Sequence, residues 1–411
     1  MGHVLWLVNH YAALPSEPGG TRHYWLSKGL QNLGWDVRMI RSGSTHSPHR
    51  PWSPQVEVVD GIQVTTIPGP PLTARGLTRV RSWAEFSAWV QAPPATKHLP
   101  KPDLVIGSTV HLGAAWAARN LAERHGAPFV LEVRDLWPET LVAMGALKRR
   151  SGVARAMLRV EGTLAGSAAL IVSPLSGAGE YMSERHGIPP ERFVWVSNGV
   201  NSEQYAATPP PPQSGLRLQY FGAVGTANDV TSIIDSVEQA NRLLPEPVHL
   251  QVFGIGPNRD TLMKRVAASP VLAPVVGFPA PVPSHEVPKA MAWGNALVLT
   301  VRHLPGLYRY GISMNKLFDY LASGRWILMG SDVQENPIAD APGLSLCEPS
   351  VEGLTSAIVR AARMDPRARA RIARGNIAIA QDRFDYRVLA RVLGSSLEDV
   401  IRDHGAARKQ S

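Results

Sequence analysis

Residues 310–324, YGISMNKLFDYLASG, restrict the function of this chain more sharply than any other stretch. A helix that begins at Ser313 would have one apolar face, made of Met314, Leu317, Phe318 and Leu321. Its opposite face would be polar and would carry Ser313, Lys316, Asp319 and Tyr320. The stretch therefore predicts one face that packs and one that holds a ligand, although an ordinary surface helix has the same pattern.

The polar residues of this stretch indicate what the ligand is. Gly311 before the helix and Ser313 as its cap would leave free backbone N–H groups at a positive helix end. Lys316 adds a full charge there, which favours a phosphate group. Asp319, one turn deeper, can accept hydrogen bonds from sugar hydroxyls.

Length and composition indicate two domains. The chain has 411 residues, of which 44% are hydrophobic, enough for two domains of roughly 200 residues. No window approaches the roughly 20 apolar residues of a membrane span, and the first residues lack a basic leader with a cleavage site. A single cysteine, Cys347, excludes a disulfide framework and a cysteine-cluster metal site. We therefore expect a soluble, cytosolic protein.

The net charge of +9 is unevenly distributed. Residues 1–200 carry 20 Lys and Arg against 14 Asp and Glu, which gives +6, and the remainder carries +3. This bias suits anionic partners such as phospholipid headgroups or phosphorylated substrates. Basic stripes interleaved with aromatic residues are missing, so we do not expect nucleic-acid binding.

The first residues predict a βαβ unit with a glycine loop. An apolar run at 3–8 is followed by a loop with Gly19 and Gly20, a helix from near Thr21 and a second strand. The two glycines permit a close backbone approach that can cradle a phosphate or admit a sugar acceptor, and a flexible surface turn would look the same. The loop is not a G-x-G-x-x-G fingerprint, so a dinucleotide fold is not expected.

Residues 72–91 combine basic and aromatic side chains. The basic ones are Arg75, Arg79 and Arg81, and the apolar ones are Leu77, Val80, Trp83, Phe86 and Trp89. This combination is typical of helices that lie on an anionic membrane. An ordinary helix with its aromatic face in the core is an equally good interpretation.

The predicted parallel sheet continues through residues 103–107 and 128–133, and the second of these strands ends in RDLWPET. Side chains at the carboxyl end of a parallel strand face the ligand crevice, which makes Arg134, Asp135 and Glu139 candidate catalytic residues. Arg134 and Asp135 could instead pair only with each other. His111 follows another strand end, where it would line the crevice or serve a structural role.

A second α/β series begins at Leu216, after a proline run at 209–212 that we interpret as a stiff connector. It continues with a strand that ends in FG at 221–222, a helix at 230–243, a strand at 248–254 and a helix at 259–268. The two halves therefore have the same plan, although no sequence repeat is visible.

Five stretches in this order resemble family 4 of the GT-B glycosyltransferases. They are the Gly19-Gly20 loop, SNGVNSEQY at 197–205, FGAVG at 221–225, VFGIGP at 252–257 and NKLFDYLASG at 315–324. The resemblance implies an α/β protein with two Rossmann-like domains that face each other across a cleft. The expected boundaries are an acceptor-binding domain at 1–198, a linker at 199–215, a nucleotide-sugar-binding domain at 216–384, and a C-terminal helix at 385–411 that can return to the first domain.

RDLWPET and SMNKLFDYLASG resemble in particular a branch that transfers acetamido sugars, such as N-acetylfucosamine, during synthesis of bacterial surface polysaccharides. This implies a UDP-sugar donor as substrate, a lipid-linked or glycan acceptor, peripheral contact with the cytosolic face of an anionic membrane, and retention of anomeric configuration. It also implies no cofactor and no metal, because helix ends and basic side chains neutralise the leaving diphosphate.

The resemblance also assigns residues to the donor. Gly222, Gly225 and Thr226 would approach the diphosphate, Ser313, Asn315 and Lys316 would hold phosphate or donor sugar, Asp319 would bind the ribose, and Gly277 and Phe278 would lie near the nucleobase. Gly19, Gly20 and His111 would belong to the acceptor side.

The chain departs from the family pattern at three places. Ala223 and Asn228 stand where the family has an Arg and a Lys, so Lys316 must compensate, with Arg302 or Arg309 as helpers. Gly311 replaces the first of two glutamates, and Asp319 replaces the second. Arg134 and Asp135 stand where many members have a His that touches the donor sugar.

We therefore expect a retaining glycosyltransferase in which the leaving phosphate helps to deprotonate the acceptor, so that no protein base is required. Asp135 and Glu139 would position the acceptor hydroxyl. A UDP-sugar 2-epimerase with the same fold and a noncatalytic scaffold that binds sugar nucleotides remain alternatives.

Overall fold

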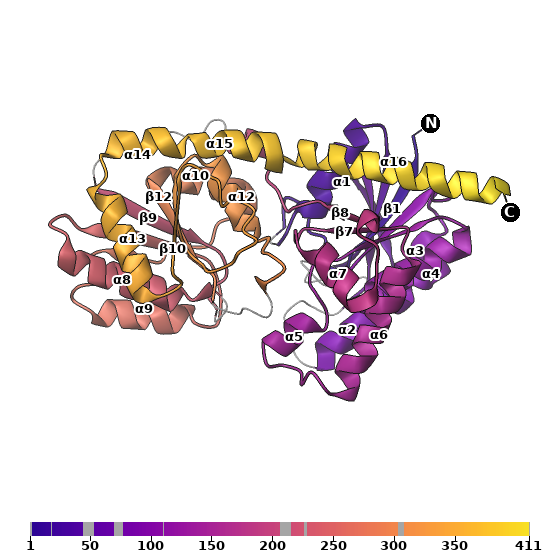
Figure 1. Cartoon of the computed structure of the whole chain (residues 1–411), viewed down its shortest axis with the longest axis horizontal. Helices are drawn as coiled ribbons and strands as arrows, with labels where there is room; N and C mark the ends of the chain where they lie inside the picture. Colours follow the sequence, from indigo (N-terminus) through magenta and orange to yellow (C-terminus); the bar gives the residue numbers. More distant parts are fainter. Residues whose placement is uncertain are drawn as a thin grey trace. The chain divides into compact units, whose positions relative to one another are not determined.

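The computed structural model describes residues 2–17, 19–43, 53–69, 77–109, 111–205, 215–225, 228–302 and 308–410. The chain forms two compact units (Figure 1). The first unit comprises Met1–Asn198, Gly306–Ser313 and Tyr386–Ser411, and the second comprises Gly199–Pro305 and Met314–Asp385. The predicted proline connector at 209–212 and the predicted donor residue Thr226 lie outside the described residues.

Within its described residues, the first unit contains an eight-stranded sheet in the order β3-β4-β2-β1-β5-β6-β7-β8. Its strands are β1 (Val4–Val8), β2 (Asp36–Ser42), β3 (Gln55–Val59), β4 (Ile62–Ile67), β5 (Leu104–Ser108), β6 (Phe129–Glu132), β7 (Leu170–Ser173) and β8 (Phe193–Trp195). All neighbouring strands are parallel except β3 and β4, which pair antiparallel at the edge. The carboxyl ends of the parallel strands therefore meet along one edge.

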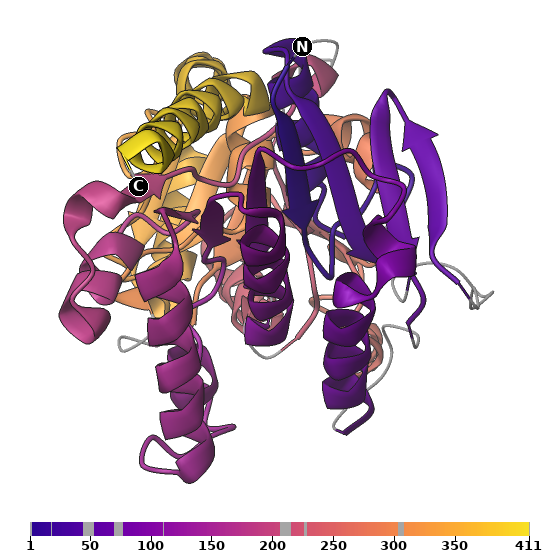
Figure 2. The same ribbon diagram turned by 90° about the vertical axis from the view of Figure 1, so that its right-hand side faces the viewer.

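Helices cover both faces of this sheet because its central strands alternate between two cores. Leu5 of β1 packs in a cluster with Leu26 and Leu389, whereas Trp6 packs in another with Phe86 and Leu164. The helices of this unit are α1 (Arg22–Asn32), α2 (Leu77–Gln91), α3 (Pro93–Thr96), α4 (Leu112–His125), α5 (Glu139–Ala143), α6 (Gly152–Ser167), α7 (Ala178–His186) and α16 (Tyr386–Gln410). Figure 2 shows this unit with the long α16 beside the sheet.

The C-terminal helix α16 packs closely on α1. A Cβ atom on Gly29 would lie 2.3 Å from the Cβ of Ala390, so only glycine at position 29 allows this approach. Leu389, Leu393 and Leu397 of α16 complete the core on this face of the sheet.

The second unit contains a parallel sheet in the order β11-β10-β9-β12-β13-β14 among its described residues. The strands are β9 (Leu216–Phe221), β10 (Val248–Phe253), β11 (Val276–Gly277), β12 (Ala296–Thr300), β13 (Trp326–Gly330) and β14 (Leu344–Cys347). The helices are α8 (Val230–Leu243), α9 (Arg259–Ala268), α10 (Val287–Ala290), α12 (Asn315–Ala322), α13 (Val351–Arg363), α14 (Pro366–Ala373) and α15 (Gly375–Ile379). The predicted α/β class with two parallel-sheet domains is therefore confirmed.

The predicted start of the helix in residues 310–324 is wrong. Helix α12 begins at Asn315, and Ser313 does not cap it. Instead, the Ser313 hydroxyl accepts a hydrogen bond from the backbone N–H of Asn198 at 3.1 Å. Tyr320, placed on the polar face by the prediction, is fully buried, and its hydroxyl accepts a hydrogen bond from the Phe221 N–H at 2.9 Å.

Burial of the aromatic residues in 72–91 favours the core interpretation of this helix over the membrane one, while Arg75 lies outside the described residues. Phe86 of α2 is buried in the core, and Trp89 packs against it. The Trp83 Nε1 donates to the Tyr11 hydroxyl at 2.8 Å. The aromatic face of α2 is therefore largely turned toward the protein interior.

Candidate active site

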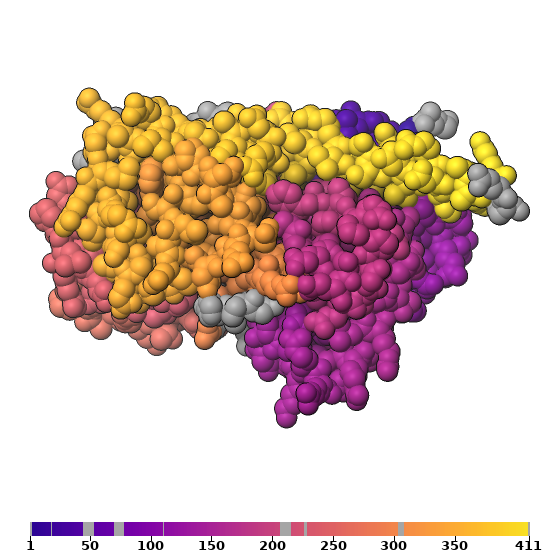
Figure 3. Space-filling model, viewed as in Figure 1, coloured from indigo at the N-terminus to yellow at the C-terminus, as the bar shows by residue number. Residues whose placement is uncertain are grey.

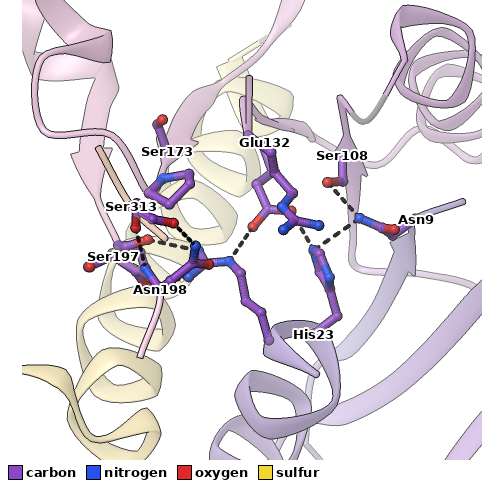
Figure 4. Close-up of polar contacts among 12 residues, drawn as sticks. Asn9, His23, Ser108, Glu132, Ser173, Ser197, Asn198 and Ser313 are labelled. Atoms are coloured by element: carbon purple, nitrogen blue, oxygen red, sulfur yellow. Dashed lines mark hydrogen bonds and ion pairs between the residues drawn. The ribbon is translucent and has the colours of Figure 1, made fainter. Parts of the chain in front are cut away.

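A buried cluster of charged residues lies at the carboxyl edge of the first sheet (Figure 4). Glu132 ends β6 and is 3% exposed. Its Oε1 accepts from the Arg22 Nε at 3.0 Å, and its Oε2 lies 2.6 Å from the Nε2 of His23. Burial alone would raise the pKa of Glu132, but His23 and Arg22 hold it well below the usual range. Glu132 is therefore a buried carboxylate with two partners from the start of α1.

Polar side chains at neighbouring strand ends extend this cluster. Asn9, directly after β1, places its Nδ2 at 2.8 Å from the hydroxyl of Ser108 and 3.2 Å from the Nε2 of His23. Burial lowers the pKa of His23, and its Nδ1 is buried without a hydrogen-bond partner among the described residues. One nitrogen of the ring is thus a buried polar atom that the described residues leave unpaired.

Arg22 connects the cluster to the residues just before Asn198, where the first segment of the first unit ends. Its Nη2 donates to the carbonyl of Val196 at 2.8 Å, and its Nη1 donates to the carbonyl of Ser197. The next residue, Asn198, donates from its side chain to the carbonyl of Ser313 (Figure 4). The segments that end at Asn198 and at Ser313 are therefore fixed to each other before the chain enters the second unit.

Two neutral histidines lie beside the cluster. The Nδ1 of His111 accepts from the Ala114 N–H at 3.2 Å and caps α4, so its Nε2 carries the proton and donates to the Nδ1 of His10 at 3.1 Å. Burial lowers the pKa of both rings to about 3. His111, predicted on the acceptor side, is 4% exposed and caps a helix.

The three predicted catalytic residues are placed differently from one another. Among the described residues, Arg134 and Asp135 form no ion pair; Arg134 is half-buried with its Nε unpartnered, and Asp135 is exposed. Glu139 instead binds Arg149, with an Nη1 to Oε2 distance of 2.9 Å, and approaches Arg185. These two arginines occupy its carboxylate, which argues against the predicted contact with an acceptor hydroxyl.

The glycine loop of the first unit precedes α1. Gly19 has a φ of +132°, a conformation that L side chains rarely adopt, and a Cβ there would lie 3.1 Å from the Cβ of Ala13. Gly20 follows it and is partly exposed. The loop thus places backbone without side chains directly before Arg22 and His23.

In the second unit, a lysine lies against the loop that follows β9. The Nζ of Lys316 donates to the Oδ1 of Asn228 at 2.7 Å and to the Tyr220 hydroxyl at 3.2 Å. It also lies 4.7 Å from the centre of the Tyr220 ring. Gly222 leaves room for this lysine, because a Cβ there would lie 3.1 Å from Nζ.

The charge of Lys316 is not balanced by a carboxylate. Within the described part of the chain, it forms no ion pair, and burial lowers its pKa to about 7. No carboxylate is therefore available here to stabilise the charged form of Lys316.

A pocket of about 320 Å³ opens beside the same loop. Gly225, Asn258 and Arg302 are among the residues that line it. Arg309, the other predicted helper, belongs to the first unit, where it binds Glu180 at 2.8 Å and Glu184 at 2.6 Å. Arg302 therefore remains a candidate helper for Lys316, whereas Arg309 does not.

Asp319 lies one turn after Lys316 on α12. Its Oδ1 accepts a hydrogen bond from the Tyr205 hydroxyl at 2.8 Å. Burial raises the pKa of Asp319 to about 6, although this hydrogen bond lowers it. The second carboxylate oxygen has no protein partner among the described residues and can accept a hydrogen bond from a ligand.

The remaining predicted donor residues lie at other positions of the second unit. Gly277 ends β11, and the Phe278 carbonyl accepts from the Arg259 Nη2 at 3.0 Å. The same guanidinium lies 5.6 Å from the centre of the Phe278 ring. Asn315 is exposed at the first position of α12. Arg259 thereby holds the loop after β11 in place.

Sequence reasoning missed the Arg22, His23 and Glu132 cluster. A glutamate inside the apolar strand FVLEV was the available signal, because a charge at a buried strand position requires a partner. It also missed Tyr205 and Tyr220, whose sequence context gives no sign of their partners on α12.

Comparison with known proteins gives a family match for part of the chain and a fold match for all of it. Residues 19–199, less than half of the chain, match the family model described as a glycosyl transferase 4-like domain. No curated protein sequence matches significantly.

Solved structures match over nearly the whole chain. Sucrose-phosphate synthase from Thermosynechococcus elongatus has a TM-score of 0.72 at 16% identity, over 98% of this chain and 100% of its own. HepE of Anabaena in complex with UDP and glucose gives 0.65 at 14% identity, over 97% and 100%. Trehalose 6-phosphate synthase from Burkholderia multivorans gives 0.69 at 14% identity, over 100% and 99%. The chain has the GT-B fold.

The described residues contain no group of three or more His, Cys, Asp or Glu that is placed to hold a metal ion. They also contain no helix with the length and apolar character to cross a membrane.

Proposed function

We propose that this protein is a glycosyltransferase that moves a hexose from a UDP-sugar to a hydroxyl group of an acceptor. The observation that carries the proposal is Lys316, a cation without an anionic partner in the described structure, held beside a glycine loop at the carboxyl ends of parallel strands. Ligands of such sheets bind outside these strand ends, and a diphosphate supplies the missing negative charge.

The second unit would bind the nucleotide. Lys316 would neutralise the diphosphate, and the backbone of Gly222 and Gly225 would approach it, with Arg302 nearby. Asp319 would accept hydrogen bonds from the ribose hydroxyls through its free oxygen. Asn315 would face the phosphate or the sugar, and the segment of Gly277 and Phe278 would lie near the uracil.

The first unit would bind the acceptor, with Arg134 and Asp135 at the strand edge and the loop of Gly19 and Gly20. In the reaction, the acceptor oxygen forms a bond to the anomeric carbon, and the bond from that carbon to the diphosphate breaks. The leaving UDP takes the bonding electron pair, and its phosphate oxygen receives the acceptor proton. We propose retention of configuration and no metal requirement, because Lys316 would stabilise the developing charge.

Several similarities support this assignment. The match of residues 19–199 to a glycosyl transferase 4-like domain favours glycosyl transfer, and solved structures of this fold include complexes with UDP and glucose. The RDLWPET stretch favours an N-acetylated or deoxy sugar as the transferred group, and a lipid-linked or polysaccharide-precursor acceptor.

The test is UDP release from a panel of UDP-sugars in the presence and absence of a bacterial membrane extract. We expect release that depends on the extract, together with a sugar-labelled lipid fraction, and loss of both in Lys316→Met. Sugar conversion without extract would instead indicate an epimerase. Tight UDP binding without release from any donor would indicate a noncatalytic scaffold.

A further inference from the structure

The turn between α5 and α6 forms an exposed surface that is both basic and apolar. We name it the basic tip and define it as residues 144–159. Met144 and Val153 are each 61% exposed, which is unusual for large aliphatic side chains. The exposed cations of the tip are Lys148, Arg149, Arg150, Arg155 and Arg159. In Figure 3 this magenta region protrudes at the lower edge of the first unit.

The charge of the basic tip has little internal compensation. No acidic residue occurs between Glu139 and Glu161 in the sequence. Arg149 pairs with Glu139, and the other four cations form no ion pair among the described residues. A solvated helix of a globular protein usually mixes both signs, so four uncompensated cations around two exposed aliphatic side chains indicate a partner surface.

The tip is held firmly by the rest of the first unit. Ser151 caps α6 by accepting from the Ala154 N–H at 3.2 Å. Further along this helix, the buried Glu161 accepts from the Tyr181 hydroxyl at 2.9 Å and lies 2.8 Å from the Nε2 of His186. The tip therefore presents its side chains from a fixed support.

The position of the tip relates it to the candidate active site. Helices between parallel strands run back along the sheet, so their first turns lie at the carboxyl edge of the strands. Figures 1 and 2 show the first turns of α2 and α6 at the same edge of the first unit. Val80 of α2, which is 54% exposed, and the neighbouring exposed Arg79 add to the surface at this edge.

We propose that the basic tip docks the first unit on the surface of an anionic lipid bilayer. Its cations would contact lipid phosphates, and Met144 and Val153 would enter the interface between headgroups and acyl chains. The proposal deepens the proposed function and rests on it for one consequence: the docked tip would hold the strand edge with Arg134 and Asp135 near a lipid-linked acceptor.

The composition of the tip favours a bilayer over nucleic acid. Nucleic-acid surfaces combine cations with aromatic side chains for stacking or amides for reading bases, and residues 144–159 contain neither. Exposed aliphatic side chains within a cationic segment gain free energy by entering lipid and gain nothing from a phosphate backbone.

The test is co-sedimentation of the full chain with phosphatidylcholine vesicles, with and without phosphatidylglycerol. The test variant is Lys148→Glu/Arg150→Glu/Arg155→Glu. Each Lys or Arg near an anionic surface contributes about 1 kcal/mol, or about fivefold, so the loss of three should weaken binding to anionic vesicles about 100-fold or more. Met144→Ser/Val153→Ser should abolish the fraction that stays bound at high salt, where charge attraction is screened.

The matched control is Arg363→Glu/Arg367→Glu/Arg371→Glu, which makes the same charge change on exposed arginines of the second unit. We expect it to bind anionic vesicles within severalfold of the unchanged protein. An equal loss in the control would show that only net charge matters and would overturn the proposal. Absence of wild-type binding to anionic vesicles, or tighter binding to a short DNA duplex at the same salt, would also overturn it.

Binding of UDP by each variant separates this proposal from the proposed function. Unchanged UDP affinity shows that the donor site of the second unit is intact, and an unchanged thermal unfolding profile shows that the first unit of each variant is folded. If vesicle binding fails while UDP-dependent transfer persists, the basic tip is refuted alone. If vesicle binding follows the expectation but no donor releases UDP, the docking surface stands and the glycosyltransferase assignment is wrong.

Discussion

Replacement of Lys316 by Met tests the charge on which the proposed donor site depends. The Nζ of Lys316 is held at 2.7 Å from Asn228, and no carboxylate of the described chain competes for it. A hydrogen bond to a charged group contributes about 1.5 to 3 kcal/mol, so Lys316→Met should weaken UDP binding about 10- to 150-fold. Lys264→Met, which removes an exposed lysine of α9 in the same unit, should leave it unchanged.

The pH dependence gives a second, independent signature of this lysine. Burial lowers the pKa of Lys316 to about 7, and a bound diphosphate favours the charged form and raises this pKa again. Above pH 7 binding therefore requires uptake of a proton, and the affinity for UDP should fall by up to about tenfold per pH unit. The terminal phosphate of UDP is already fully charged there, because its second pKa is about 6.

Isothermal titration calorimetry of UDP between pH 6 and 9 measures both effects, with buffers of different ionisation enthalpy to count the protons. Wild type should take up a proton on binding above pH 7, whereas Lys316→Met should take up none and show a flat profile. Equal affinities of wild type and Lys316→Met at pH 7, or parallel pH profiles, would refute the assignment of Lys316 to the diphosphate.

Two further predictions concern buried carboxylates. Glu132→Ala should reduce the free energy of unfolding by about 3 to 5 kcal/mol in urea titrations, because it leaves Arg22 buried without its partner; a loss below about 1 kcal/mol would contradict the buried ion pair. Asp319→Asn should be more stable than wild type above pH 6 and equal to it near pH 3, since a carboxyl with a raised pKa destabilises the folded state only where it is ionised. The same variant should bind UDP more weakly, and thermal unfolding across pH with UDP titration at pH 8 measures both; lower stability of Asp319→Asn at pH 8 would contradict the raised pKa.

Periodicity and turn residues were sufficient to predict the α/β class and several strands of both sheets. Apolar runs such as FVLEV and ALVLT form strands buried on both faces, and the glycines after β9 and β10 mark sharp turns at strand ends. These signals are local, because each depends on neighbours within one element.

Several contacts that the sequence did not reveal join residues that are far apart in the chain. Ser313 has every local mark of a helix cap, but Asn198, which is 115 residues away, occupies its hydroxyl and its carbonyl. Glu139 follows the carboxyl end of a parallel strand, where a catalytic residue is expected, but Arg149 and Arg185 occupy its carboxylate. Lys316 lies on α12 beside the loop that follows β9; its role toward the donor stays a prediction.

Packing of α16 on α1 has a consequence for biosynthesis. Leu26 and Leu30 of α1 are covered in part by Leu389 and Leu393, which the ribosome adds only after the whole sequence of the second unit. During translation, the second unit can fold from a nearly continuous segment. The apolar face of α1 stays uncovered until α16 has been synthesised. A nascent chain stalled before α16 should therefore engage chaperones through its amino-terminal half, although that half was synthesised first.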